Sequence, residues 1–165
     1  DDKKAGGSIL SRSGSSLECD YVVGKDENIY YLIANHIIEN NLDCIIVDEA
    51  QFLTEKQVDE LSDVVDNLDI PVLCYGLRAD AFTHLFPGSK RLFEIADVIE
   101  ELKAICVCKS KATYNLRLNR IDGELVPVFS GEQVSIDGID AEYDSVCRVC
   151  YKKLKKDIIK YKNNK

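Results

Sequence analysis

The chain has 165 residues, 45% of them hydrophobic and 30% charged, which is the balance of a globular domain with one full core. Its formal net charge of −8 repels phosphate backbones, so we expect no nucleic-acid partner. No apolar run approaches the roughly 20 residues that span a bilayer, and the opening residues lack the basic-then-apolar pattern of a secretion signal. We therefore expect a cytoplasmic protein with no membrane partner.

The first half of the chain predicts alternating strands and helices. Residues 1–20 are rich in Gly and Ser and predict a loop around a short strand, and residues 26–41 carry apolar side chains at helical spacing. The apolar stretch 44–47 predicts a strand buried on both faces of a parallel sheet. A capping-box sequence then opens a helix over 54–68, and 70–75 predicts the next strand. Strand, helix and strand within about 30 residues indicate a βαβ unit and an α/β fold.

The second half changes in character after one more helix and strand, which we expect at 89–96 and 98–107. Glycines then punctuate short apolar stretches, as in a small separate lobe. We expect an α/β domain over 1–105, a second lobe over 106–155 and a basic, flexible tail over 156–165.

Two acidic residues, Asp48 and Glu49, follow the apolar strand directly. Ligands of open α/β folds bind at the carboxyl edge of the parallel sheet, where this couplet should lie. An apolar strand that ends in Asp-Glu, here residues 45–49, is the Walker B arrangement, in which the Asp holds Mg²⁺. The neighbouring carboxylate can then accept a proton from an attacking hydroxyl. The structural alternative is that Asp48 merely ends the strand and caps the next segment.

The phosphate-binding partner of a Walker B strand, G-x-x-x-x-G-K-[ST], does not occur in the sequence. The pair Gly24-Lys25 is followed by Asp26, and Cys19 stands where the first glycine would be. If Asp48 has the Walker B role, we expect the phosphate-binding loop upstream of the first residue.

Seven cysteines, an odd number, argue against a disulfide framework in a cytoplasmic chain. Cys44 and Cys74 stand in apolar runs and are expected in the core. Besides Cys19, two close pairs remain, in the patterns C-x-C and C-x-x-C: Cys106, Cys108, Cys147 and Cys150. Four thiolates in two pairs predict a structural zinc site, whereas the alternative is four ordinary cysteines.

Aromatic residues could form one wall of a pocket near the acidic couplet. Phe52 follows the couplet closely, and Phe86 and Tyr143 lie further along the chain. The Gly-containing stretch 131–138 could lay backbone amides against a flat ligand. Aromatic residues of this kind are also common in ordinary cores.

These segments together resemble the type II thymidine kinases. The resemblance spans nearly the whole chain and is carried by IIVDEAQFLT, IPVLCYGLRADAF, LFPGS, EELKAICVC, KATYNLRL, GEQVSIDG and YDSVCRVCY. It implies an ATP-dependent kinase that uses Mg²⁺ and transfers the γ-phosphoryl group to the 5′-hydroxyl of thymidine, giving dTMP. It also implies a P-loop α/β domain, with helices flanking a parallel sheet, and a zinc-bearing lobe whose lasso loop covers the nucleoside, in a homotetramer.

The same resemblance assigns roles by position. Glu49 matches the general base and Asp48 the metal-linked Walker B residue, and Ala50 and Gln51 complete the expected nucleotide-binding set. The expected thymidine contacts are Phe52, Leu77, Phe86, Ser135, Ile136, Asp137, Gly138 and Tyr143. The expected ligands of a structural Zn²⁺ are Cys106, Cys108, Cys147 and Cys150.

The residues alone leave two other functions open. In a nucleic-acid-stimulated motor ATPase, Glu49 would activate water instead of a sugar hydroxyl, although the acidic charge argues against nucleic acid. A zinc-stabilised interaction module would have no catalytic activity at all.

Overall fold

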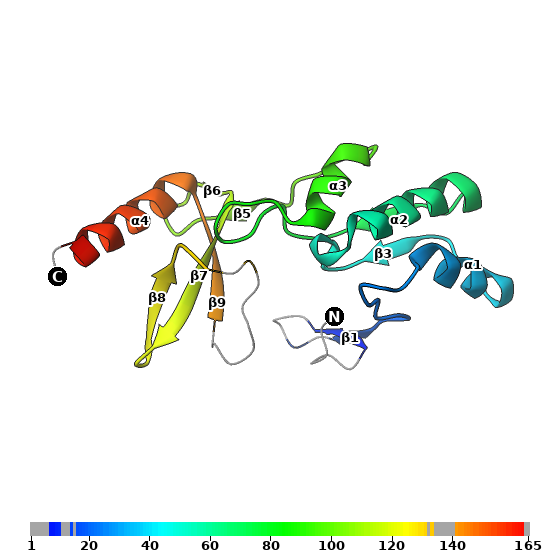
Figure 1. Cartoon of the computed structure of the whole chain (residues 1–165), viewed down its shortest axis with the longest axis horizontal. Coiled ribbons are helices and arrows are strands. Elements are labelled where there is room, and N and C mark those ends of the chain that lie inside the picture. The colour runs from blue at the N-terminus through cyan, green and yellow to red at the C-terminus, as the bar shows by residue number, and fades with distance from the viewer. Residues whose placement is uncertain (1–6, 11–13, 15, 132, 134–140, 164–165) are drawn as a thin grey trace. The chain divides into compact units, whose positions relative to one another are not determined.

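The structure is a computed structural model that describes residues 7–10, 14, 16–131, 133 and 141–163 (Figure 1). The chain divides into two compact units. The first unit consists of residues 1–48 and 53–74, and the second of residues 49–52 and 75–165. Within the described part of the chain, no helix combines the length and the apolar character that crossing a bilayer requires.

The first unit contains the predicted βαβ element. Its elements are β1 (Ser8–Leu10), β2 (Ser16–Glu18), α1 (Ile29–Glu39), β3 (Ile45–Val47), α2 (Glu55–Leu68) and β4 (Val72–Cys74). β1 and β2 pair antiparallel, whereas β3 and β4 pair parallel, with Ile45 opposite Val72 and Val47 opposite Cys74. The sequence predicted this parallel pair and the helix that connects it.

The core of the first unit lies between the two helices and one face of the β3–β4 pair. α1 and α2 lie side by side (Figure 1), and they contribute the buried side chains of Ile33 and Val64. Because strand side chains alternate, Ile45 and Val47 face this core, whereas Ile46 is 65% exposed. The expectation that this strand is buried on both faces is therefore wrong for the described chain, in which α1 and α2 cover one face.

Polar side chains of α2 fix the start of α1. The predicted capping box is confirmed, since Gln57 and Thr54 hydrogen-bond each other's backbone N–H groups. The side-chain Nε2 of Gln57 also donates to the carbonyl of Gly24 at 2.8 Å. Glu60, which is buried, accepts from the N–H of Ile29 at 2.9 Å, and a carboxylate at a helix N-terminus is stabilised by the helix dipole.

The second unit is built around a small antiparallel sheet. Its elements are the 3₁₀ turn η1 (Ala50–Phe52), α3 (Pro87–Ile95), β5 (Ala104–Ile105), β6 (Lys111–Ala112), β7 (Tyr114–Ile121), β8 (Glu124–Val128), β9 (Ala141–Val146) and α4 (Arg148–Asn163). β7 is the central strand, with β8 and β9 on either side, and β5 and β6 form a separate two-stranded ribbon. The strand expected over 98–107 is reduced to β5.

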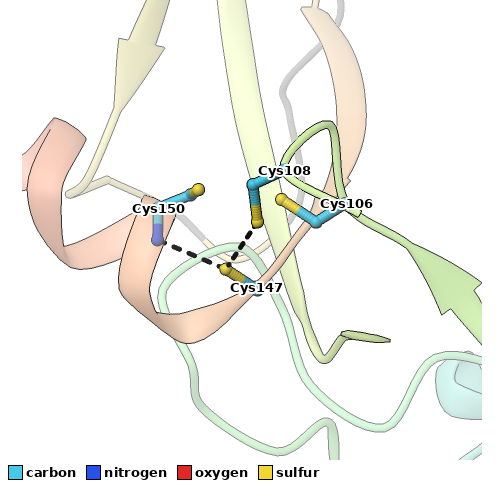
Figure 2. A group of neighbouring side chains, drawn as sticks. All are labelled: Cys106, Cys108, Cys147 and Cys150. Atoms are coloured by element: carbon cyan, nitrogen blue, oxygen red, sulfur yellow. Dashed lines mark hydrogen bonds between the residues drawn. The ribbon is translucent and has the colours of Figure 1, made fainter. Parts of the chain in front are cut away.

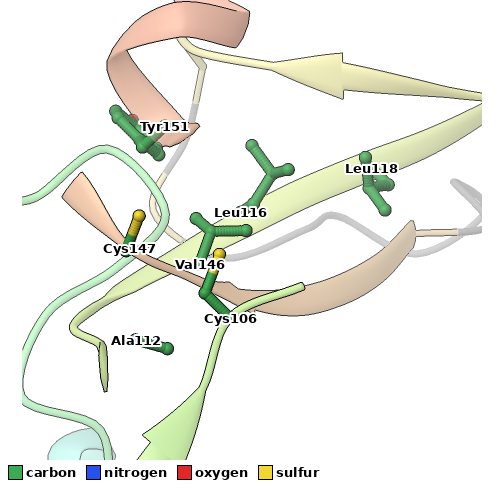
Figure 3. Packing of buried hydrophobic residues seen from close by; sticks show 7 residues of the cluster. All are labelled: Cys106, Ala112, Leu116, Leu118, Val146, Cys147 and Tyr151. Atoms are coloured by element: carbon green, nitrogen blue, oxygen red, sulfur yellow. The ribbon is translucent and has the colours of Figure 1, made fainter. Parts of the chain in front are cut away.

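Residues from β7, β9, α4 and the cysteine segments form the core of this unit (Figure 3). Its buried members are Cys106, Ala112, Leu116, Leu118, Val146, Cys147 and Tyr151. The ring of Tyr151 packs against Tyr114 and Phe129, with centroids 5.1 and 5.2 Å away. The first turns of α4 are thus anchored on the sheet.

The basic C-terminal segment is helical. The sequence predicted a flexible tail over 156–165, but α4 continues to Asn163. Lys is a good helix former, and Leu154 packs against the core at the start of the lysine-rich run. A charge pattern alone does not reveal that anchor.

Candidate active site and metal centre

The segments that follow β3 and β4 meet beyond the ends of these parallel strands. The N–H of Ala50 donates to the carbonyl of Tyr75 at 2.9 Å and joins the two segments. Asp48 and Glu49 are both exposed, whereas Ala50 is buried. The acidic couplet is therefore accessible to solvent, whereas the residue that follows it, Ala50, is buried.

Glu49 has an unusual backbone conformation. Its φ of +52° lies in the left-handed region, where a non-glycine residue costs on the order of 1–3 kcal/mol. The carbonyl of Glu49 accepts from the N–H of Phe52 at 3.0 Å, which closes the η1 turn. Strained residues of this kind concentrate at functional sites, where surrounding contacts hold them in place.

The side chain of Gln51 connects the two segments. It is 1% exposed, its Nε2 donates to Oε2 of Glu49, and its Oε1 accepts from the N–H of Leu77 at 2.9 Å. Of the four residues expected to bind the nucleotide, Ala50 and Gln51 are enclosed, and the side-chain amide of Gln51 is engaged within the protein.

Three of the expected thymidine contacts lie on neighbouring segments of the second unit. The rings of Phe52 and Phe86 meet edge to face, with centroids 5.5 Å apart and planes at 80°. Phe86 is buried, whereas Phe52 and Leu77 remain partly exposed. The hydroxyl of Ser89 donates to the carbonyl of Leu77 at 2.7 Å and so fixes the start of this segment against α3. Phe52, three residues after Glu49 in the chain, thus packs against Phe86 and leaves part of its ring exposed.

The remaining expected contacts are the lasso, residues 135–138, and Tyr143. Ser135, Ile136, Asp137 and Gly138 lie outside the described residues. Tyr143 lies on β9 opposite Arg117 and is 38% exposed. Gln133 precedes these four residues in the chain, and its Nε2 donates to the carbonyl of Leu85 at 3.3 Å.

A hydrogen-bonded turn over 78–84, in which Asp80 and Ala81 are buried, was not predicted from the sequence. Oδ1 of Asp80, a residue only 5% exposed, accepts from the N–H groups of Phe82 and His84, each at 2.8 Å. The hydroxyl of Tyr151 donates to the carbonyl of Ala81 at 2.7 Å. Burial, with the nearby charge of Asp80, raises the pKa of Tyr151, which keeps this hydroxyl protonated as a donor. The segment LRADAF was noted only for its resemblance, which gave no sign of these bonds.

The four cysteines of the two close pairs come together in the second unit (Figure 2). Their Sγ atoms all lie within 4.8 Å of one another, and those of Cys108 and Cys147 are 3.6 Å apart. Four thiolates at about 2.3 Å from one zinc ion would be about 3.8 Å apart. The cluster can therefore hold a metal ion, as the spacing of the two pairs predicted.

Local backbone structure brings each pair to the cluster. Between β5 and β6, the N–H of Cys106 donates to the carbonyl of Ser110 at 2.9 Å, and Lys109 turns the chain with a φ of +67°. Cys147 directly precedes α4, and the N–H of Cys150 in its first turn donates to Sγ of Cys147 at 3.4 Å. A tight turn and a helix start thus supply two ligands each.

The thiols of the cluster hold their protons unequally. Hydrogen bonds with Ser110 lower the pKa of Cys108 to about 6, whereas hydrogen bonds with the Cys108 and Cys147 thiols raise the pKa of Cys150 to about 12. A cation that replaces the shared protons would stabilise all four thiolates.

A cavity of about 640 Å³ adjoins this cluster. Its lining includes Arg78 and Lys111, but Arg78 donates to the carbonyl of Thr113 at 3.0 Å and Lys111 pairs with Glu101. These cations already have partners within the protein. Cys108, Cys147 and Cys150 also line the cavity, so it belongs to the metal centre.

Comparison with known proteins gives consistent matches. Residues 1–151 match the family model described as thymidine kinase. The thymidine kinase of Pasteurella multocida (strain Pm70) is 51% identical over 92% of this chain and 77% of its own length. The thymidine kinase of Haemophilus influenzae (strain Rd) is 47% identical, over 92% of this chain and 76% of its own length. That of Shewanella oneidensis (strain MR-1) is 45% identical, over 90% and 74%.

Proposed function

This chain belongs to the thymidine kinase family, and we propose that its phosphoryl transfer takes place at the acidic couplet that follows β3. A member of this family is a phosphotransferase whose substrates are ATP and thymidine. The γ-phosphoryl group of ATP is transferred to the 5′-hydroxyl of thymidine, which gives dTMP.

Glu49 is the general base of this reaction. Its carboxylate accepts the proton of the 5′-hydroxyl as the hydroxyl oxygen attacks the γ-phosphorus, and ADP leaves. The observation that supports this role is the fixed position of Glu49: it has a strained backbone, it lies two residues after the end of β3, and its carboxylate is held by a buried amide. Such positioning provides much of the catalysis in phosphoryl transfer.

Asp48 is the residue linked to Mg²⁺. An exposed carboxylate at the end of a strand suits this ion, which prefers oxygen ligands and retains several waters. When bound with ATP, Mg²⁺ neutralises charge on the phosphates. Asp48, Glu49, Ala50 and Gln51 form the proposed nucleotide-facing turn.

The thymidine pocket combines the apolar surface of the second unit with the lasso. Its proposed contacts are Phe52, Leu77, Phe86, Ser135, Ile136, Asp137, Gly138 and Tyr143. The edge-to-face pair of Phe52 and Phe86 supports this assignment, because it presents a partly exposed aromatic surface that can pack against a base.

The metal of the cysteine cluster is a structural Zn²⁺ held by Cys106, Cys108, Cys147 and Cys150. Four sulfur ligands in a closed set suit zinc and leave no position for a substrate. We propose that the lobe over 106–155 depends on this Zn²⁺ for folding. Residues 1–105 form the proposed kinase domain. We place the enzyme in the cytoplasm, since none of the seven cysteines forms a disulfide. We also propose a homotetramer, which light scattering would test.

A labelled-phosphate assay tests this function. The full gene product is incubated with Mg²⁺, γ-labelled ATP and thymidine, and the label is expected in thymidine 5′-monophosphate. A motor ATPase would instead release inorganic phosphate without thymidine, faster with single-stranded DNA, and an interaction module would give neither product. Either of those results would contradict the proposal.

A further inference from the structure

Gln51 is a polar residue in an almost fully enclosed position. It lies in the middle of η1 and is 1% exposed, together with Val58 and Val64 among the most deeply buried large side chains of the described residues. Burying an amide costs free energy unless both of its ends find hydrogen-bond partners. A hydrophobic residue would fill the same space without that requirement.

The amide has a partner at each end, on two different segments. Its Nε2 donates to the carboxylate of Glu49, and its Oε1 accepts from the backbone N–H of Leu77 at 2.9 Å. One side chain therefore ties the proposed base to the backbone of a residue in the proposed thymidine pocket. The hydroxyl of Ser89 fixes that same residue from α3, through its carbonyl.

The neighbouring glycine leaves room for this arrangement. A Cβ atom on Gly76 would lie 2.5 Å from Oε1 of Gln51, a distance that real Cβ atoms essentially never show. It would also lie 3.1 Å from the backbone nitrogen of Gln51. The φ of Gly76 is outside the left-handed region, so close approach to Gln51, and not backbone conformation, is what requires glycine here.

We propose that Gln51 is a positioning residue for the phosphoryl transfer. Its amide holds the Glu49 carboxylate in the orientation that accepts the 5′-hydroxyl proton, and it sets that orientation relative to Leu77. Gly76 supports the same function by admitting the amide. This inference rests on the proposed role of Glu49, and it gives Gln51 a task that differs from contact with ATP.

Replacement of Gln51 by Met tests the proposal, because Met has a similar length and no amide. We expect kcat to fall about 10- to 100-fold while KM for thymidine and for ATP changes less than about threefold, since misplacing a catalytic group lowers turnover more than binding. Gln57→Met is the matched control: Gln57 is 3% exposed, and the hydrogen bonds of its side chain all lie within the first unit. With rates corrected for the folded fraction, the control should keep kcat within about twofold of the wild type. A Gln51→Met enzyme that also keeps kcat within about twofold would overturn the proposal.

Two further variants keep the test decisive if Gln51→Met folds poorly. Gln51→Glu retains an oxygen for the N–H of Leu77 but places a second carboxylate beside Glu49. Like charges at this distance share a proton, so we expect the acid limb of the kcat/KM profile to move up by about one pH unit or more. An unmoved limb would show that the side chain at position 51 does not contact the base, and it would contradict the proposal. Gly76→Ala should reproduce the kcat loss of Gln51→Met, and adding it to Gln51→Met should cost little more.

Glu49→Gln separates this proposal from the function on which it rests. If that variant retains near-normal turnover, Glu49 is not the base and both proposals fall. If Glu49→Gln is inactive while the acid limb of Gln51→Glu and the kcat of Gln51→Met match the wild type, only the role of Gln51 falls.

Discussion

Cys74, the last residue of β4, shows how burial controls the chemistry of a single side chain. Desolvation raises the pKa of its thiol from 9.0 to about 11. The neutral form is favoured in the folded protein, as expected for a small apolar residue facing the core of the first unit. The prediction of Cys74 as a core residue is thus confirmed, whereas Cys44, given the same prediction, is exposed. Cys44 directly precedes β3 and so escapes the packing of that strand.

The thiol of Cys74 should therefore react slowly with iodoacetamide. At pH 8 a pKa of about 11 leaves about 100-fold less thiolate than a pKa of 9.0, and only the thiolate reacts. The rate should rise about tenfold per pH unit until about pH 11. Peptide mass spectrometry after timed alkylation measures it, with the exposed Cys44 as the internal reference. Equal rates at the two positions would contradict this account.

The same shift predicts how stability depends on pH. The folded pKa of Cys74 is raised above its unfolded value of 9.0, so the contribution to stability is complete below pH 9. It is lost as the pH rises through about 11, because only the unfolded chain releases the proton readily. Between pH 9 and about pH 11, Tm should fall less in Cys74→Ala than in the wild type. Parallel curves of Tm against pH would contradict the raised pKa of Cys74.

Single residues also mark the limit of prediction from sequence. The acidic couplet could be found because an apolar strand followed by two carboxylates is a local pattern. The positive φ of Glu49 and the contact between Gly76 and Gln51 could not, since both depend on where two distant segments meet. The burial of Asp80 could not be predicted from the sequence for the same reason.

At the scale of elements, the cysteine cluster joins the β5–β6 turn to the start of α4. The two strands are short, with two residues each. So little regular structure gives few backbone hydrogen bonds of its own. A metal ion held by both segments would supply the missing stabilisation.

Replacement of Cys150 by Ser should therefore remove the metal and destabilise the second unit. We expect about one zinc per chain in the wild type and much less in the variant, with Tm lower by about 10 °C or more, because a chain of this size loses about 2–4 °C per kcal/mol. Elemental analysis and thermal melts measure the two effects, and Cys44→Ser, outside the cluster, should change neither. A Cys150→Ser protein with full zinc content and unchanged Tm would refute a zinc-binding role for this residue.

Helices and strands with strong local patterns were predicted well. The capping box of Thr54 and Gln57 located α2, and the parallel pair was placed correctly around it. The strand expected over 98–107 was not, because its apolar residues include Val98 and Ile99, which are 75% and 56% exposed. The missed part of α4 depends on the packing of Leu154, which a run of lysines does not reveal.

At the scale of the whole molecule, most of the proposed catalytic residues lie in the second unit. β3, Asp48 and β4 belong to the first unit, whereas residues 49–52 and 75–165 belong to the second. Glu49, Gln51 and Leu77 all lie in the second unit, which also carries the cysteine cluster and the strand bearing Tyr143. A base and an apolar surface within one compact unit suit a reaction that depends on fixed positions.

Single-turnover phosphorylation of thymidine by the full gene product carrying Glu49→Gln tests this account most directly. Glu49 is exposed, so the variant should fold normally, with a Tm close to that of the wild type and thymidine affinity within about threefold. Because Gln cannot accept the hydroxyl proton, the rate of the chemical step should fall by about 10²–10⁴-fold. A rate close to that of the wild type in a normally folded variant would show that Glu49 is not the base.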